Sequence, residues 1–247
     1  MFRCSIGEGW RCALALSGGV LLLLLEGCGL NETSFRYRTT VTVVASGHTY
    51  TGSSVCEYSV TPQLPGFAFQ SPPETRGRGE ATLVELPGNR VLVALTHGWD
   101  RGGPPAVDPD WWTGWYAIFR APNVPQPPNL HADVVVRALG SLRSSSPVVL
   151  NPSELPILVT FADRLAPDTV AVVDPANPAA ALGRDVQSVR VSVSVTRDPL
   201  FSEMIDEHLP WIKSLAAGDT LDGQVHETVW DSSMTSNIDG SYFIRRR

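Results

Sequence analysis

Phe35-Arg36-Tyr37-Arg38-Thr39-Thr40-Val41-Thr42-Val43 is the stretch of sequence that decides the fold. Its odd-numbered positions are mostly apolar, and its even-numbered positions are arginine or threonine. This period of two is typical of a strand with one face buried and one face in solvent. Ala45-Ser46-Gly47-His48 supplies turn residues, and 50–60 has the composition of a returning strand. The sequence therefore predicts a β-hairpin over 35–60.

Further strands are predicted on both sides of the middle of the chain. Pro87-Gly88-Asn89 separates 80–86 from 90–95 and indicates a second hairpin. The almost wholly apolar run 155–161 is typical of a central strand. The valines of 189–195 alternate with polar residues, which again indicates a strand with one face in water. Two short candidates, 169–173 and 242–244, complete the set.

Helices are predicted at three places. Asp108 and Pro109 are typical of a helix start, and the aromatic residues of 109–120 recur at helical spacing. A second helix is expected over 130–142, and Pro210 divides the helical pattern of 201–215 into a kinked or double helix. The proline- and glycine-rich segment 62–79 is predicted to be a loop. With six to eight strands, two to four short helices and no alternating β–α order, we expect a predominantly β α+β fold, with antiparallel sheets and short helices packed on them.

The first 28 residues have the pattern of a bacterial export signal. Arg3 and Arg11 precede an apolar run, Ala13 to Leu25, whose length suits a signal peptide better than a membrane-spanning helix. Gly27-Cys28 resembles the site at which lipoproteins are cleaved and acylated, although Glu26 stands where a small or apolar residue is usual. A cleaved soluble export signal and an uncleaved anchor are the alternatives.

These features give a domain organisation and a location. Residues 1–27 form the predicted signal peptide, 28–34 a linker next to the anchor, and 35–247 a single β-rich domain. Cys28 is the predicted lipidation site, carrying palmitate or a similar acyl chain. We expect an exported protein that is anchored by its N-terminus in the cell envelope, at the outer membrane or in the periplasm.

Composition narrows the possible partners. The chain has a net charge of −6, which argues against nucleic acid as a partner. If Cys28 is acylated, Cys56 is left without a disulfide partner in the folded domain and is expected to pack as a small buried hydrophobe. If Cys28 is not acylated, a Cys28–Cys56 bridge is conceivable.

The aromatic residues are the leading candidates for a binding surface. Trp99, Trp111, Trp112 and Trp115 lie close together in the sequence. Clustered exposed tryptophans often mark protein interfaces, and flat rings also stack on sugars. A helix that buries its aromatic face against a sheet would use the same residues, so core packing is the alternative.

Catalytic and metal-binding patterns are weak. The five histidines show no metal-ligand spacing, and no phosphate loop or nucleophile elbow is present. No cofactor or metal is therefore predicted, and no catalytic residue is assigned. His97, at the end of a predicted strand, is the one position that suggests an active site, although a plain strand-to-loop transition explains it as well.

Several segments together resemble a family of uncharacterised exported proteins and lipoproteins of proteobacteria. The similar segments are Phe35-Arg36-Tyr37-Arg38 with Thr51-Gly52-Ser53-Ser54-Val55, Leu155-Pro156-Ile157-Leu158-Val159-Thr160-Phe161, Leu209-Pro210-Trp211 and Leu221-Asp222-Gly223. The resemblance covers most of the chain after the signal and is weakest over 100–128. It implies export and a single domain, and it implies no activity and no catalytic residue.

Two functions are therefore expected from the sequence. The first is a non-enzymatic envelope lipoprotein, a binding or structural module that acts at the membrane surface. As a binding module it would bind a protein or a glycan. It predicts an exposed aromatic or apolar patch. The alternative is a periplasmic hydrolase, which predicts that His97, a serine and an aspartate converge in one pocket. Whether the protein is an enzyme stays open, and the binding module is preferred.

Overall fold

The hairpin predicted from the opening stretch is present as strands β1 (Thr33–Ala45) and β2 (His48–Thr61). They pair antiparallel over their whole length, from Thr33 opposite Val60 to Ala45 opposite His48. The structure is a computed structural model, and it describes residues 32–61, 73–98, 112–200, 204–215, 219–222, 235 and 237–245. The signal segment with Cys28, and the tryptophans Trp99 and Trp111, lie outside these residues.

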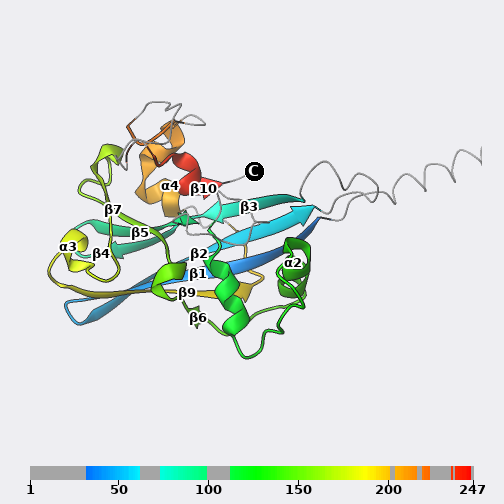
Figure 1. Ribbon diagram of the computed structural model, residues 1–247. Helices are drawn as coiled ribbons and strands as arrows, with labels where there is room; N and C mark the ends of the chain where they lie inside the picture. The colour runs from blue at the N-terminus through cyan, green and yellow to red at the C-terminus, as the bar shows by residue number, and fades with distance from the viewer. Residues whose placement is uncertain are drawn as a thin grey trace, which may run out of the picture.

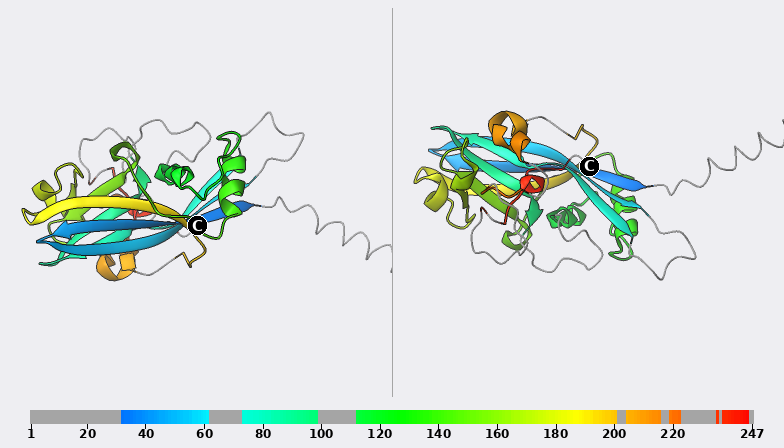
Figure 2. Two further views of the ribbon diagram at one scale, coloured as in Figure 1. Left: turned by 90° about the horizontal axis from the view of Figure 1, so that it is seen from below. Right: turned by 90° about the horizontal axis from the view of Figure 1, so that it is seen from above.

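The hairpin is the centre of the larger of two antiparallel sheets (Figures 1 and 2). Sheet A has the order β10-β3-β2-β1-β9-β6, and sheet B has the order β4-β5-β7-β8. The remaining strands of sheet A are β3 (Glu74–Glu80), β6 (Val148–Val149), β9 (Val186–Thr196) and β10 (Ile244–Arg245). Sheet B is formed by β4 (Thr82–Leu86), β5 (Arg90–Gly98), β7 (Pro156–Phe161) and β8 (Val170–Val172).

The helices are short and lie at the faces and ends of the sheets (Figure 1). The α-helices are α2 (Ala132–Gly140), α3 (Ala179–Leu182) and α4 (Met204–His208). The 3₁₀ helices, labelled η, are η2 (Gly114–Arg120), η3 (Pro152–Glu154), η4 (Pro167–Thr169), η5 (Pro210–Ser214) and η6 (Gly240–Tyr242). The predicted fold class, predominantly β α+β with antiparallel sheets, is confirmed.

Two apolar cores hold these layers together. The larger core lies on the inner face of sheet A, where sheet B covers one part of the face and α2 with η2 covers the other. The smaller core lies on the other face of sheet B, under α4, η5 and Phe243. Pro210 separates α4 from η5, so the predicted division of the 201–215 pattern is confirmed for the described residues.

The prediction of a loop over 62–79 is wrong for its last part, because β3 begins at Glu74. The inward positions Gly77 and Gly79 of this strand carry no side chain, so its sequence has no apolar alternation to detect. Gly79 has a φ of +145°, and a Cβ atom there would lie 2.6 Å from Sγ of Cys56. The close packing of β3 on β2 therefore requires glycine, which also masks the strand in the sequence.

The predicted helix over 109–120 is a 3₁₀ helix, η2, in the part that the structure describes. Within η2, Trp115 and Ile118 are buried, as are Gly114 and Ala117, and the members of each pair are three residues apart. A spacing of three matches the three residues per turn of a 3₁₀ helix, so the buried stripe follows that period. The strand β6 is a further element that the sequence did not predict, since two residues are too few to show a pattern.

No helix among the described residues is long and apolar enough to cross a membrane.

Candidate functional site

The two described tryptophans of the predicted aromatic surface lie in the larger core. Trp112 is buried against Gly98 and Gly114, and its Nε1 donates a hydrogen bond to the carbonyl oxygen of Glu154 at 2.8 Å. Its backbone amide donates to the carbonyl of Thr96 at 3.0 Å. Trp112 therefore joins the end of β5 to the segment before β7, which is a structural role.

Trp115 is fully buried at the centre of an aromatic cluster. Its ring lies 5.0 Å from that of Phe35, 5.1 Å from that of Tyr58, and stacks on Tyr116 at 4.1 Å. Of the two alternatives that the sequence left open, core packing therefore holds for Trp112 and Trp115. They form no exposed surface because Trp115, in η2, and Trp112, just before η2, pack on aromatic side chains of β1 and β2.

His97, the residue on which the hydrolase alternative depends, is closed off from solvent. The side chain is 5% exposed, and Tyr242 stacks on its ring at a centroid distance of 3.8 Å. Its Nδ1 lies 3.1 Å from Oγ1 of Thr96. His97 lines neither of the two surface hollows described below.

Cys56 is a free, buried thiol, as the sequence predicted for a cysteine without a partner. Burial raises its pKa to about 12, so the thiol stays protonated at neutral pH and is a poor nucleophile. Within the part of the chain that the structure describes, no group of three or more histidine, cysteine, aspartate or glutamate residues is placed to hold a metal ion.

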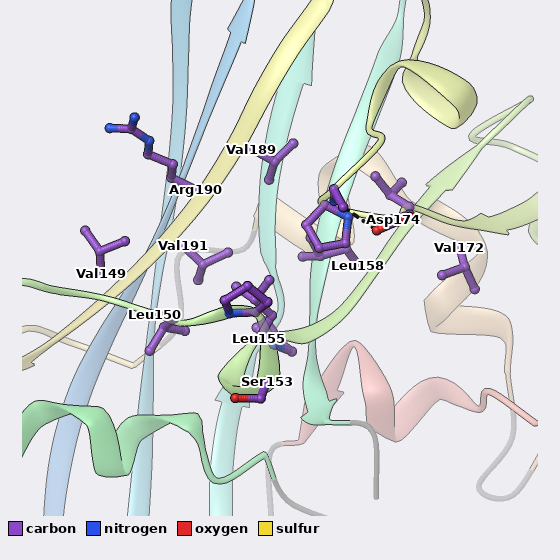
Figure 3. A pocket seen from close by; sticks show the side chains of 15 residues that line it. Val149, Leu150, Ser153, Leu155, Leu158, Val172, Asp174, Val189, Arg190 and Val191 are labelled. Carbon is purple, nitrogen blue, oxygen red and sulfur yellow. Dashed lines mark hydrogen bonds between the residues drawn. The ribbon is translucent and has the colours of Figure 1, made fainter. Parts of the chain in front are cut away.

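An apolar groove lies where sheets A and B open toward solvent (Figure 3). It encloses about 470 Å³, within the usual range of ligand sites, about 300–1,000 Å³. Sheet A contributes β9 and the segment at β6, and sheet B contributes β7 and β8. The apolar residues that line it are Val149, Leu150, Leu155, Leu158, Val172, Val173, Val189 and Val191.

The groove leaves apolar side chains in contact with water. The exposed large hydrophobic residues of the described chain are Leu130, Val149, Leu165 and Val172, and two of the four line the groove. Val149 is 58% exposed and Val172 is 37% exposed. Deeper in, Leu158 and Val191 are buried and belong to the larger core. The groove is therefore an open margin of that core.

Strand edges form both walls of the groove. β8 is the last strand of sheet B, and β6 covers β9 only at Val193 and Ser192. The amide of Leu150 donates to the carbonyl of Val191 at 2.9 Å, so the backbone groups of Val191 point toward this edge. In an extended strand, residues two apart direct their backbone groups the same way, so those of Val189 also point toward the groove.

Charged groups stand at the rim of the groove and do not enter it. Figure 3 shows the side chain of Arg190 directed away from those of Val189 and Val191. Arg190 is exposed on the outer face of sheet A, opposite Thr42. On the other side, Oδ1 of Asp174 accepts a hydrogen bond from the amide of Ala176 at 2.9 Å, which orders the turn after β8. The groove itself can therefore bind apolar side chains and backbone, and it holds no pair of groups suited to acid–base catalysis.

Sequence reasoning missed this groove. Its lining comes from three segments, near 149–158, 172–176 and 189–191, which meet only through the packing of the two sheets. The one available signal was the pair of short valine-rich runs, 148–150 and 170–173, which the structure places at the edge strands β6 and β8.

A second, shallower hollow is polar. It is lined by Ser141, Arg143, Ser144, Thr196, Arg197 and Asp198, at the C-terminal end of α2.

Comparison with known proteins does not assign the chain to a family. No family model, no curated protein and no solved structure matches the chain.

Proposed function

We propose that this protein is a non-enzymatic binding module of the cell envelope, anchored through an acylated Cys28, which takes an extended segment of a partner protein into the groove between β8 and β9. The observation that carries the proposal is an apolar groove whose walls are the edges of two sheets. A strand added along β9 would receive backbone hydrogen bonds from Val189, while its inward side chains would cover Val172 and Leu158. Such an addition would remove exposed apolar surface and an exposed strand edge at the same time.

The charge at the rim defines the partner further. A strand lying along β9 would place one outward side chain next to Arg190 on the outer face of sheet A. Opposite charges at such cross-strand positions stabilise a sheet, so a glutamate or aspartate is expected there. The proposed partner segment therefore alternates apolar residues with polar ones and carries a carboxylate opposite Arg190.

A protein partner is favoured over a glycan, the other ligand considered from the sequence. Stacking on a sugar requires exposed aromatic rings, and Trp112 and Trp115 are buried. The groove instead offers strand edges, which suit an extended peptide. The hydrolase alternative has no specific support either, because His97 lies in the interior and lines neither hollow.

The test uses the full chain, solubilised in detergent, and a fluorescein-labelled acetylated peptide of sequence Ser-Val-Glu-Val-Ser-Val-Thr. Fluorescence anisotropy should report saturable binding, and Val172→Asp should abolish it because a buried unpaired charge would face the apolar peptide side chains. Leu165→Asp, which introduces the same charge at another exposed hydrophobic residue away from the groove, is the control and should bind normally.

Charge reversal tests the register. Arg190→Glu should lower the affinity for the glutamate peptide by about two- to fivefold, as expected for the loss of a cross-strand ion pair. The same variant should bind a peptide with lysine in place of glutamate more tightly than the unchanged chain does. Equal binding by Val172→Asp and the unchanged chain would remove the groove as the binding site.

A further inference from the structure

One end of the molecule is rich in arginine although the protein as a whole is acidic. Arg36 and Arg38 lie within the first six positions of β1, and β3, which pairs with β2, contributes Arg76 and Arg78. Arg143 and Arg197 line the polar hollow beside them. We call this set of six residues (Arg36, Arg38, Arg76, Arg78, Arg143 and Arg197) the arginine end.

Strand pairing and helix packing bring the six side chains to the same end. Arg36 lies opposite Thr196 on β9 and opposite Glu57 on β2, and Glu57 in turn lies opposite Arg78 on β3. The guanidinium of Arg197 donates to the carbonyl of Gly140 at the end of α2. Figure 2 shows α2 and the beginning of β1 at this same end of the molecule.

The carboxylates of the arginine end form ion pairs with the arginines, but they are too few to neutralise the positive charge. Arg36 and Arg78 both bind Glu57, whose side chain is only 8% exposed beneath them. Burial works to raise the pKa of Glu57, but the hydrogen bonds from Arg78 and Arg36 outweigh it and hold that pKa below its ordinary value. Asp198 accepts from Thr196 and Arg38, which lowers its pKa as well. These carboxylates therefore stay ionised and hold the guanidinium groups in place.

The six arginines are accompanied by four carboxylates, Glu32, Glu57, Glu74 and Asp198. The Asp133–Arg137 ion pair of α2 adds no net charge. The local charge is thus positive in a chain whose net charge is −6. Arg76, Arg143 and Arg197 are exposed, and the side chains of Arg36, Arg38 and Arg78 are 36%, 34% and 41% exposed. Each guanidinium has five N–H donors, so donors remain for an anion after one carboxylate is bound.

The chain length before β1 decides which surface this end meets. Five peptide bonds separate Cys28 from Thr33, a reach of at most about 18 Å. β1 itself has 13 residues, which at about 3.3 Å per residue extend over roughly 43 Å. An acyl chain on Cys28 therefore keeps the Thr33 end of β1 near the bilayer, while the turn at Ser46-Gly47 lies far from it.

We infer that the arginine end docks on anionic phospholipid headgroups, with the groove between β8 and β9 left accessible to a partner. The inference rests on the proposed anchor at Cys28 and is independent of the proposed peptide site. Arginine recognises phosphate through paired N–H donors, and basic residues close to an anionic bilayer are attracted to it.

The test compares the full chain reconstituted in vesicles of phosphatidylcholine alone and in vesicles that also contain phosphatidylglycerol. Amide hydrogen exchange of 141–146 and 196–198 should slow in the anionic vesicles at low salt, and high salt should reverse the effect. Arg143→Glu should lower the ratio of docked to undocked protein by about fivefold or more. Arg184→Glu, between α3 and β9, is the matched control and should leave the ratio unchanged.

Three outcomes separate the proposals. Equal exchange in both kinds of vesicle, or an equal loss in Arg143→Glu and Arg184→Glu, would overturn the docking of the arginine end. Failure of the chain to float with phosphatidylcholine vesicles would overturn the anchor and this inference with it. A peptide that does not bind the groove in detergent would overturn the peptide site alone and leave the docked orientation standing.

Discussion

The inner face of sheet A is covered in one part and open in another, and both parts are lined by similar apolar residues. In the part covered by η2 and α2, Val136 and Leu139 are completely buried, together with aromatic side chains such as Trp115. At the β8–β9 margin, valine and leucine side chains reach solvent, and Val149 is 58% exposed. Residue type therefore does not distinguish core from groove in this protein; the presence or absence of a covering element does.

This comparison decides, for Trp112 and Trp115, between the two alternatives that the sequence left open. The tryptophans were candidates for a binding surface because large aromatic residues contribute strongly to binding at interfaces. In the structure they fill the covered part, where their size is needed between a sheet and a short helix. The open part uses valines, whose small exposed surfaces give little signal in a sequence.

The largest expected effect lies in the covered part. Trp115→Ala should lower the free energy of unfolding by about 3–5 kcal/mol, because it leaves a cavity among Phe35, Tyr58 and Tyr116. Chemical denaturation measures this loss, with Trp115→Phe as a milder control. A stable Trp115→Ala variant that loses only peptide binding would contradict the comparison.

Leu158 tests the boundary between the two parts, since it belongs to the larger core and also lines the groove. Leu158→Ala should cost about 2–3 kcal/mol, near the low end for a buried leucine, because water and neighbouring side chains can enter from the groove. Peptide affinity should fall in the same variant. A stability loss as large as that of Trp115→Ala would show that the groove floor is packed as tightly as the covered core.

Tyr116 carries a buried hydroxyl with no hydrogen-bond partner among the described residues. Tyr116→Phe should therefore raise stability by about 1 kcal/mol at neutral pH. Burial raises the pKa of Tyr116 to about 12, above the ordinary value of 10. The folded state thus holds this proton more tightly than the unfolded state. The free energy of unfolding of the unchanged chain is therefore constant with respect to this group below pH 10, and it falls as the pH rises from 10 toward 12.

Denaturation curves recorded from pH 8 to pH 12 check this dependence. Tyr116→Phe should lose less stability across that range than the unchanged chain. Parallel curves for the two proteins would show that the hydroxyl is not shielded from solvent as the covered part requires.

The smallest effect is expected at the open margin. Val172→Ala should change the free energy of unfolding by no more than about 0.5 kcal/mol, since the side chain is already 37% exposed. The same substitution should weaken peptide binding in the anisotropy assay. A loss of more than about 2 kcal/mol would mean that Val172 is a core residue and not part of a binding surface.

Much of the fold could be predicted because period-two patterns report directly on one-sided burial. The strands β1, β2, β9 and the β4–β5 hairpin were all expected near their observed positions. β3 was not predicted because its inward positions include glycines, of which Gly79 packs against Cys56. β6 was not predicted because it has only two residues. The 3₁₀ geometry of η2 was not expected, since positions three and four apart do not separate the two kinds of helix over so short a stretch.

The sequence by itself determined the alternation of the strands, the β-rich fold class and the acidic balance of the chain, and it predicts an export signal. Each of these depends on residue type and on short-range spacing, which a single chain displays. Only the tertiary structure decided that Trp112 and Trp115 are core, that Val149, Val172 and Val189 share one groove, and that the six arginines of the arginine end lie together. These facts depend on contacts between segments far apart in the chain, and burial is a property of what covers a residue, which its own neighbours in sequence do not reveal.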